Sequence, residues 1–159
     1  YWSRELGVDI VALKREVQHL IGLRGDALDF LTWLKTAHPR VVLATNADRE
    51  SLELKLPLTG LEAYLDAIVS SEDVGAAKEE QAFWFALQEI EPFDPARTLF
   101  IDDNSRVLES AREFGIKHLL GIKQPDSQRP EKALQAFIAL DRFAQLMPED
   151  MPSEELKNR

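Results

Sequence analysis

Residues 98–104 read TLFIDDN, a short apolar run that is followed at once by two carboxylates and an amide. An unbroken apolar run of this length is typical of a strand buried on both faces of a parallel sheet. The run VVLA (41–44) is followed in the same way by Thr45 and Asn46. Because ligands bind at the carboxyl ends of the strands in such sheets, we expect these polar residues to lie at one site.

Helical patterns separate the apolar runs along the chain. Apolar residues recur at helical spacing over residues 26–36, 50–56, 79–90 and 104–114, and two further strand-like runs occupy 67–69 and 118–120. In the third of these helices, Phe83, Leu87 and Ile90 are expected on one buried face. The alternation of strands and helices predicts an α/β fold with a doubly wound parallel sheet.

The two ends of the chain carry weaker patterns. We expect an amphipathic helix over 9–21, with Asp9 as its cap, and mostly helical structure over 131–147, in which 136–138 could instead be a short edge strand. From residue 148 onward we expect a flexible tail. The predicted organisation is therefore a first segment (1–23), an α/β core (24–147) and a tail (148–159).

Composition excludes several classes of function. The 159 residues fit one domain, and 28 acidic against 19 basic residues give a net charge of −9, which disfavours nucleic-acid binding through a basic face. The chain has no cysteine, so it has neither disulfides nor thiol chemistry. No apolar run approaches the roughly 20 residues of a membrane span. We expect a cytoplasmic protein that binds neither nucleic acid nor membranes.

Each candidate site residue has a simpler structural interpretation when it is taken alone. Asp103 or Asn104 can cap the following helix, and Thr45 can belong to a turn. Lys78, in GAAKEE (75–80), can be an exposed lysine. Against this, adjacent carboxylates such as Asp102 and Asp103 repel each other when they lose solvent, and a hard cation such as Mg²⁺ would remove that cost.

Taken together, these residues form a more specific pattern. A hydroxyl after one strand, a lysine after the next and an acidic pair after a third resemble the last three motifs of the haloacid dehalogenase (HAD) superfamily. Receiver domains of response regulators use the same residue types but begin with the acidic pair, so the order along this chain excludes them. Segments such as KEEQAFWFAL (78–87) and FGIKHLLGI (114–122) are similar to the GMP/IMP nucleotidase branch of the HAD phosphatases.

The resemblance implies a Mg²⁺-dependent phosphate monoester hydrolase that forms an aspartyl-phosphate, with a nucleoside monophosphate as the small phosphorylated substrate. By this resemblance, Thr45 would hydrogen-bond the phosphoryl group with Asn46 beside it, and Lys78 would balance its charge. Asp102 would hold Mg²⁺, and Asp103 would assist directly or through water. The family often has proline where this chain has Ala77.

The family's nucleophile motif, Asp-x-Asp-Gly-Thr, is absent from the 159 residues. The resemblance places its strand between 41–44 and 98–101, so we expect two unpaired strand edges and a fragment without activity of its own, with 1–23 as the remnant of a helical cap. The edges could pair directly, another chain could supply a strand by self-association, or residues could be missing from the sequence.

Other functions stay open at this point. A HAD-derived binding or regulatory module without catalysis is the main alternative. A sugar-phosphate phosphatase or a phosphonatase of the same superfamily would differ only in the cap.

Overall fold

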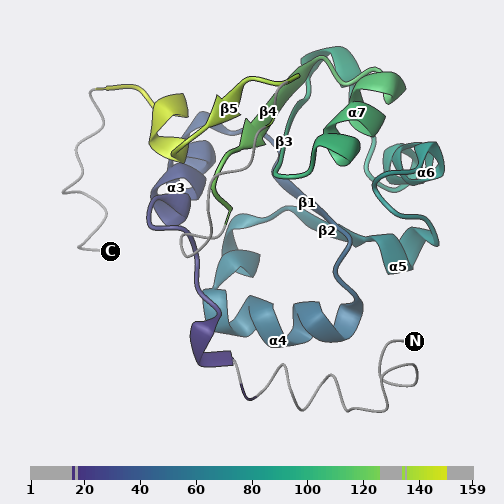
Figure 1. Ribbon diagram of the computed structural model, residues 1–159. Coiled ribbons are helices and arrows are strands. Elements are labelled where there is room, and N and C mark those ends of the chain that lie inside the picture. Colours follow the sequence, from purple (N-terminus) through teal and green to yellow (C-terminus); the bar gives the residue numbers. More distant parts are fainter. Residues whose placement is uncertain (1–15, 17, 126–133, 135, 150–159) are drawn as a thin grey trace.

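A computed structural model describes residues 16, 18–125, 134 and 136–149 of the chain. Within them, strands alternate with helices as predicted (Figure 1). The strands are β1 (Val42–Thr45), β2 (Ala67–Ser70), β3 (Leu99–Asp102), β4 (His118–Ile122) and β5 (Ala139–Leu140). The α-helices are α3 (Ala27–Ala37), α4 (Arg49–Thr59), α5 (Ser71–Val74), α6 (Gln81–Ile90) and α7 (Ser105–Phe114). Short 3₁₀ helices are η1 (Gln18–Leu20), η2 (Leu61–Tyr64), η3 (Pro95–Arg97) and η4 (Phe143–Leu146).

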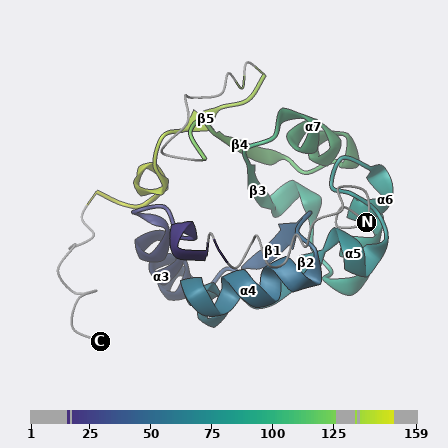
Figure 2. The same ribbon diagram turned by 60° about the horizontal axis from the view of Figure 1, so that its bottom comes forward.

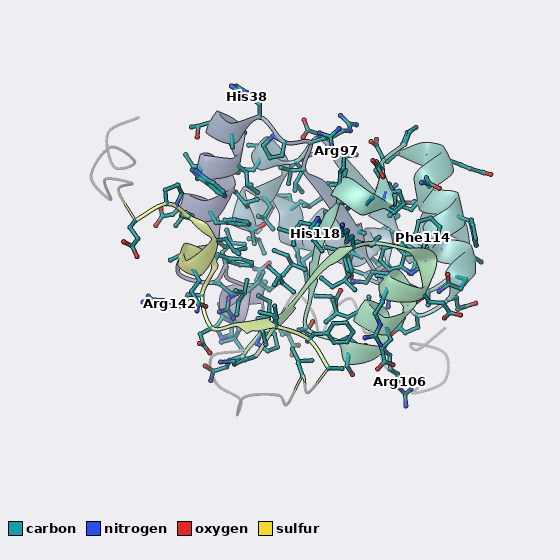
Figure 3. The ribbon with its side chains drawn as sticks, turned by 90° about the horizontal axis from the view of Figure 1, so that it is seen from above. His38, Arg97, Arg106, Phe114, His118 and Arg142 are labelled. Atoms are coloured by element: carbon teal, nitrogen blue, oxygen red, sulfur yellow. The ribbon has the colours of Figure 1, made fainter. Side chains whose placement is uncertain are left out.

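All strand pairs in the described residues are parallel. β1 pairs with β2, with Val42 opposite Ala67, and β4 lies between β3 and β5, with Leu99 opposite His118. The strands therefore run in one direction. Figure 3 shows this direction: His38 and Arg97, which precede β1 and β3, lie at one edge, while Arg106, which follows β3, lies at the opposite edge.

The strands form two sheets that share no hydrogen-bonded strand pair among the described residues. β1 has a strand only on the side of β2, and β3 only on the side of β4 (Figure 2). The predicted unpaired edges are thus present in this part of the chain, and β1 and β3 do not pair directly. The expected burial of both faces is wrong for these two strands, because residues 42–45 and 100–102 are only partly buried and Leu99 is exposed.

One hydrophobic core holds both sheets together. Helices α6 and α7 contribute most of its fully buried side chains, including Phe83, Trp84 and Val107. Val42 of β1 and Phe100 of β3 pack against the same cluster, so the two helices cover one face of both sheets. On the other side of β1, Leu43 and Thr45 line a pocket together with residues of α4. Helices therefore lie on both faces of the sheet formed by β1 and β2, as in a doubly wound fold.

A second contact region joins α3 to the C-terminal part of the described chain. The ring of Phe30 stacks on Phe143 with a centroid distance of 5.0 Å. Asp26 accepts a hydrogen bond from the backbone N–H of Ala144 (3.0 Å), and Arg24 donates to the backbone carbonyls of Gln124 and Asp141. These contacts hold α3 against η4 at the side of the molecule that Figure 1 shows on the left.

The structure of the C-terminal region differs from the prediction in two respects. The edge strand occupies 139–140 rather than 136–138, and the helix of this region is the 3₁₀ turn η4; residues 131–133 and 135 lie outside the described residues. At Gly121 of β4, an added Cβ atom would lie 2.4 Å from the side chain of Leu134 and 3.5 Å from the Cβ atom of Ala139 in β5. Glycine at this position therefore makes room for the side chain of Leu134, which precedes β5.

Helix ends agree well with the sequence. Asp48 caps α4, Asn104 caps α7, and Gly115 ends α7 with a φ of 111°. α3 ends at His38, the one non-glycine residue of the described chain with a positive φ. The predicted helix over 9–21 lies largely outside the described residues, together with Asp9, and its end at Gln18–Leu20 is 3₁₀ rather than α-helical.

The three-segment division of the chain stays a prediction, since residues 1–15, 17 and 150–159 lie outside the described residues. In the described part, no helix combines the length and the apolar composition needed to cross a membrane.

Helix α6 offers a matched test of the core. Leu87 is 6% exposed within the cluster, whereas Ile90, which was expected on the same buried face, is 53% exposed. We expect Leu87→Ala to lower the free energy of unfolding by about 2–5 kcal/mol, because it leaves a cavity. Ile90→Ala should cost less than about 1 kcal/mol. Urea unfolding of both variants measures the difference, and equal losses would contradict this description of the core.

Candidate functional site

The predicted site residues lie at the carboxyl ends of the strands. Thr45 ends β1 and is followed by Asn46, while Asp102 ends β3 and is followed by Asp103. Lys78 lies in the turn before α6, and its Nζ is 2.6 Å from Oδ2 of Asp102. The two side chains are only 12% and 8% exposed, so this is a largely buried ion pair between two separate motifs.

The hydrophobic core fixes the position of Lys78. Its backbone carbonyl accepts a hydrogen bond from Nε1 of the fully buried Trp84 (3.0 Å). Its ammonium lies 5.8 Å from the ring centroid of Phe100 in β3. Asp102 is equally constrained, because its second oxygen accepts from the backbone N–H of Asn104 (2.9 Å). Both carboxylate oxygens of Asp102 therefore have a partner.

Asn46 connects the loop after β1 to Lys78. Its Oδ1 accepts from the backbone N–H of Lys78 (2.9 Å), so these two predicted residues are in direct contact. Thr45 instead uses Oγ1 to accept from the backbone N–H of Ala47 (3.0 Å) within its own loop. The structure thus joins Asn46, Lys78 and Asp102, with Thr45 and Asp103 next to them in sequence.

The capping interpretations are resolved for these positions. The N-cap of α7 is Asn104, whose side chain accepts from Arg106 N–H (3.0 Å), so Asp103 is not used as that cap. The N-cap of α4 is Asp48, which accepts from Ser51 N–H (2.6 Å), so neither Thr45 nor Asn46 caps it.

Two residues of the site, Glu79 and Ser70, were not predicted from the sequence. Glu79 places one carboxylate oxygen 2.8 Å from Nδ2 of Asn46 and the other 3.2 Å from Nδ2 of Asn104. Ser70 is fully buried, and its Oγ donates to the backbone carbonyl of Ala47 (2.5 Å). The sequence places Ser70 at a strand end but gives no reason to prefer it to Ser71. Nothing in the pattern separates Glu79 from an ordinary exposed glutamate at a helix start.

The loop after β2 has a charge network of its own. Asp73 accepts from the backbone N–H of Ser70 (2.7 Å) and pairs with Nε of Arg49 (2.7 Å). Burial alone would raise the pKa of Asp73, but the hydrogen bond from Ser70 and the guanidinium of Arg49 outweigh it and hold this pKa below the ordinary value of 3.8. Because Arg49 lies just after the loop of Thr45, this network fixes one border of the site.

The metal ligands expected at Asp102 and Asp103 were tested against the geometry. The described residues contain no cluster of three or more His, Cys, Asp or Glu side chains that could enclose a metal ion. Two adjacent carboxylates still suit Mg²⁺, which binds through one or two carboxylates and keeps several waters. The two carboxylates therefore fit Mg²⁺ as ligands. Asp102 would then contact both the ion and the Lys78 ammonium.

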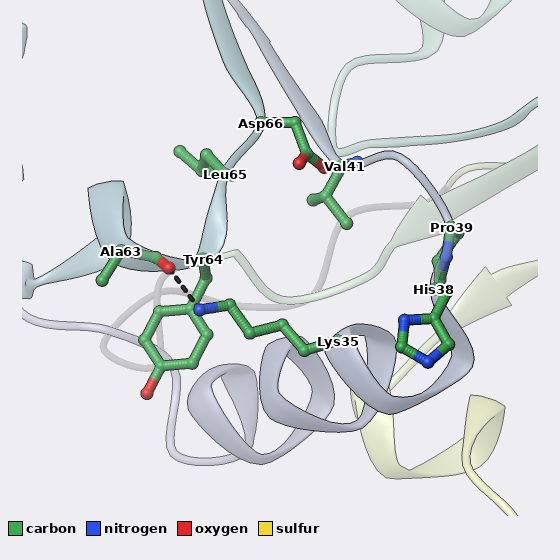
Figure 4. A pocket seen from close by; sticks show the side chains of 8 residues that line it. All are labelled: Lys35, His38, Pro39, Val41, Ala63, Tyr64, Leu65 and Asp66. Atoms are coloured by element: carbon green, nitrogen blue, oxygen red, sulfur yellow. Dashed lines mark hydrogen bonds between the residues drawn. The ribbon is translucent and has the colours of Figure 1, made fainter.

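A pocket of about 330 Å³ lies at the opposite end of β1 and β2, before the strands begin (Figure 4). The Lys35 ammonium donates to the backbone carbonyl of Ala63 and lies 4.8 Å from the ring centroid of Tyr64. Asp66 accepts from the backbone N–H of Val41 (2.7 Å). Since these polar groups satisfy one another, the strand ends with Lys78 and Asp102 are the better candidate site.

Comparison with known proteins agrees with this geometry. The family model of haloacid dehalogenase-like hydrolases matches residues 4–115. The chain belongs to this family. The GMP/IMP nucleotidase YrfG of Escherichia coli is 40% identical over 148 residues, which are 93% of this chain and 67% of that protein. The resemblance to the HAD superfamily and to its GMP/IMP nucleotidase branch is thereby confirmed.

Solved HAD structures share the fold. A HAD phosphatase from Thermococcus onnurineus superposes with a TM-score of 0.73 at 21% identity and covers 91% of this chain. The HAD-hydrolase YfnB from Bacillus subtilis, determined with bound magnesium, superposes with a TM-score of 0.67 at 21% identity and covers 78%. This chain spans 66% and 54% of those two chains, respectively. At these identities the match concerns the fold alone.

The buried ion pair of this HAD chain predicts a large effect on stability. We expect Lys78→Met to lower the free energy of unfolding by about 3–5 kcal/mol, because it leaves the Asp102 carboxylate without its charged partner. The double variant Lys78→Met/Asp102→Asn should recover at least about 1 kcal/mol of that loss. Urea unfolding of the full-length protein measures both values.

A matched control is the exposed pair of Arg40 and Glu91, in which the arginine side chain is 57% exposed. Arg40→Met should cost no more than about 1 kcal/mol. A similar cost for Lys78→Met would show that its ion pair is not effectively buried.

The lowered pKa of Asp73 predicts a pH dependence of stability. Its ionised form is favoured in the folded state, so its contribution is present above the unfolded pKa and is lost as the pH falls through the folded-state value. Asp73→Asn should therefore be less stable than the wild type near neutral pH, with the difference shrinking between about pH 5 and pH 2. Thermal unfolding across this range tests the sign, and a constant difference would contradict it.

Proposed function

We propose that this protein hydrolyses phosphate monoesters and that its substrates are purine nucleoside 5′-monophosphates. The observation that carries the proposal is the buried contact of Lys78 with Asp102 at the carboxyl ends of the strands. The similarity to a GMP/IMP nucleotidase over 93% of the chain supports the substrate class.

In this proposal, Thr45 donates to a phosphoryl oxygen. A hydroxyl group has one hydrogen to donate and two lone pairs, and Thr45 uses one lone pair on Ala47 N–H. Its hydrogen is therefore still available to a ligand. Asn46 also contributes, since only one hydrogen of its Nδ2 is needed for Glu79. The loop after β1 thus presents two donors beside each other.

Lys78 supplies the positive charge that a phosphoryl group needs. Its ammonium has three hydrogens, one of which points to Asp102. The others can contact the transferring phosphoryl group and so balance the negative charge that accumulates during attack. The attacking carboxylate itself is not assigned to a residue of these 159, and turnover by this chain alone is not expected.

Asp102 and Asp103 are the proposed holders of Mg²⁺, and Asp103 acts directly or through a water. When bound, the ion supplies charge that screens the repulsion between an attacking carboxylate and the phosphoryl group. Apart from binding the ion, Asp102 helps to position the neighbouring side chains. Asp102 holds the Lys78 ammonium, and Asn104 N–H holds Asp102 at the end of β3.

Two further expectations accompany this proposal. The unpaired edges of β1 and β3 support self-association through added strands, which sedimentation measurements would detect. The cytoplasmic location stays a prediction from the sequence.

The test is hydrolysis of GMP and IMP by a full-length protein in which this chain is joined to the family's Asp-x-Asp-Gly-Thr motif. We expect Mg²⁺-dependent release of phosphate, and a kcat at least about 100-fold lower for Lys78→Met and Asp103→Asn. The first variant removes the positive charge that balances the phosphoryl group, and the second weakens the hold on Mg²⁺. Lys117→Met, which removes an exposed lysine before β4, is the control and should keep full activity. Full activity in the Lys78 and Asp103 variants would refute the assignment of the site.

A further inference from the structure

The carboxylate of Glu79 lies between two asparagines that follow different sheets. One oxygen accepts from Nδ2 of Asn46 (2.8 Å), in the loop after β1, and the other accepts from Nδ2 of Asn104 (3.2 Å), in the loop after β3. These are the two strands that share no hydrogen-bonded pairing in the described residues. A single exposed side chain thus connects the loops at the ends of both sheets.

The orientation of both amides is fixed by a second contact. Asn46 uses Oδ1 to accept from Lys78 N–H (2.9 Å), and Asn104 uses Oδ1 to accept from Arg106 N–H (3.0 Å). Neither amide can turn over without losing that bond, so both present an NH₂ group to Glu79. Only a side chain that is an acceptor at both ends satisfies two such donors, which a carboxylate is and a carboxamide is not.

The bridge runs through all three motif loops. Glu79 directly follows Lys78, and Asn46 binds both the side chain of Glu79 and the backbone N–H of Lys78. Asn104 in turn donates its own backbone N–H to Asp102, the partner of Lys78. The contacts therefore form a closed ring, in which Glu79 is the member whose side chain alone bonds both Asn46 after β1 and Asn104 after β3.

We infer that Glu79 is a positioning residue that holds the phosphate-binding loop of Thr45 and Asn46 at a fixed distance from the acidic loop of Asp102 and Asp103. The inference rests on the proposed function of this site. The carboxylate of Glu79 bonds the two asparagine amides, and the ion pair beside it joins Lys78 to Asp102. Its effect on catalysis is therefore expected to come from geometry, to which phosphoryl transfer is sensitive.

The experiment exchanges donor and acceptor across one of the two bonds. In Glu79→Gln the introduced amide can accept from Asn46 but turns an NH₂ group towards that of Asn104. In Asn104→Asp the α7 cap is kept, because aspartate is an equally good N-cap, but an oxygen then faces Glu79. The double variant Glu79→Gln/Asn104→Asp restores a donor facing an acceptor and keeps the total charge.

We measure kcat and KM for GMP and, by calorimetry, the dissociation constant of inorganic phosphate on the full-length protein. Each single variant should lower kcat about tenfold and weaken phosphate binding about tenfold, as expected for the loss of one hydrogen bond to a charged group. The double variant should return to within about threefold of the wild type. Glu89→Gln removes an exposed glutamate of α6, the helix that follows Glu79, and should change neither value.

The outcomes separate this inference from the proposed function. A loss in both single variants with recovery in the double variant supports a direct bridge. The two single variants change the net charge in opposite directions, so a general charge effect would not lower both. Wild-type kinetics in Glu79→Gln, or a double variant no better than the single ones, would overturn the inference even if GMP is hydrolysed. If the wild type hydrolyses no phosphate ester but binds inorganic phosphate with the same loss and recovery, the proposed function fails and the positioning role stands.

Discussion

Trp84 connects the hydrophobic core of this chain to its polar site. The indole is fully buried and packs edge-on against Phe100 of β3, at 4.9 Å between ring centroids. Its N–H is shared between the carbonyl of Lys78 and the hydroxyl of Ser110 in α7. A buried indole N–H needs a hydrogen-bond partner. Trp84 therefore both fills the core and fixes the position of the Lys78 backbone.

Backbone hydrogen bonds hold the strands together within each sheet, whereas side-chain contacts connect the two sheets to each other. α6 and α7 cover both sheets from one face, and the contacts among Asn46, Lys78, Glu79, Asp102 and Asn104 join them at the carboxyl ends. Packing is non-directional, whereas hydrogen bonds and ion pairs depend on orientation. The core therefore brings the sheets together, and the polar ring sets how their ends face each other.

The sequence predicted the features that follow from strong, repeated signals. Four strands, the helix ends and the meeting of Lys78 with Asp102 follow from apolar runs and from the rule that parallel strands end at one edge. β5 was misplaced because two residues give too short a pattern. Ile90 fits the buried stripe of α6 but lies at its end, beyond the helices that would cover it. Glu79 was missed because its two partners lie in separate loops, after β1 and after β3, that only the fold brings together.

The division into two sheets also bears on how the chain folds. β1 pairs with the next strand along the sequence, β2, and β3 pairs with the next strand, β4, so every backbone ladder of the described residues joins consecutive strands. Pairing consecutive strands keeps the connecting segments short, which limits the entropy lost when each ladder closes. Within the described residues, each half thus has its own ladder, and the site is complete only when both halves pack on α6 and α7.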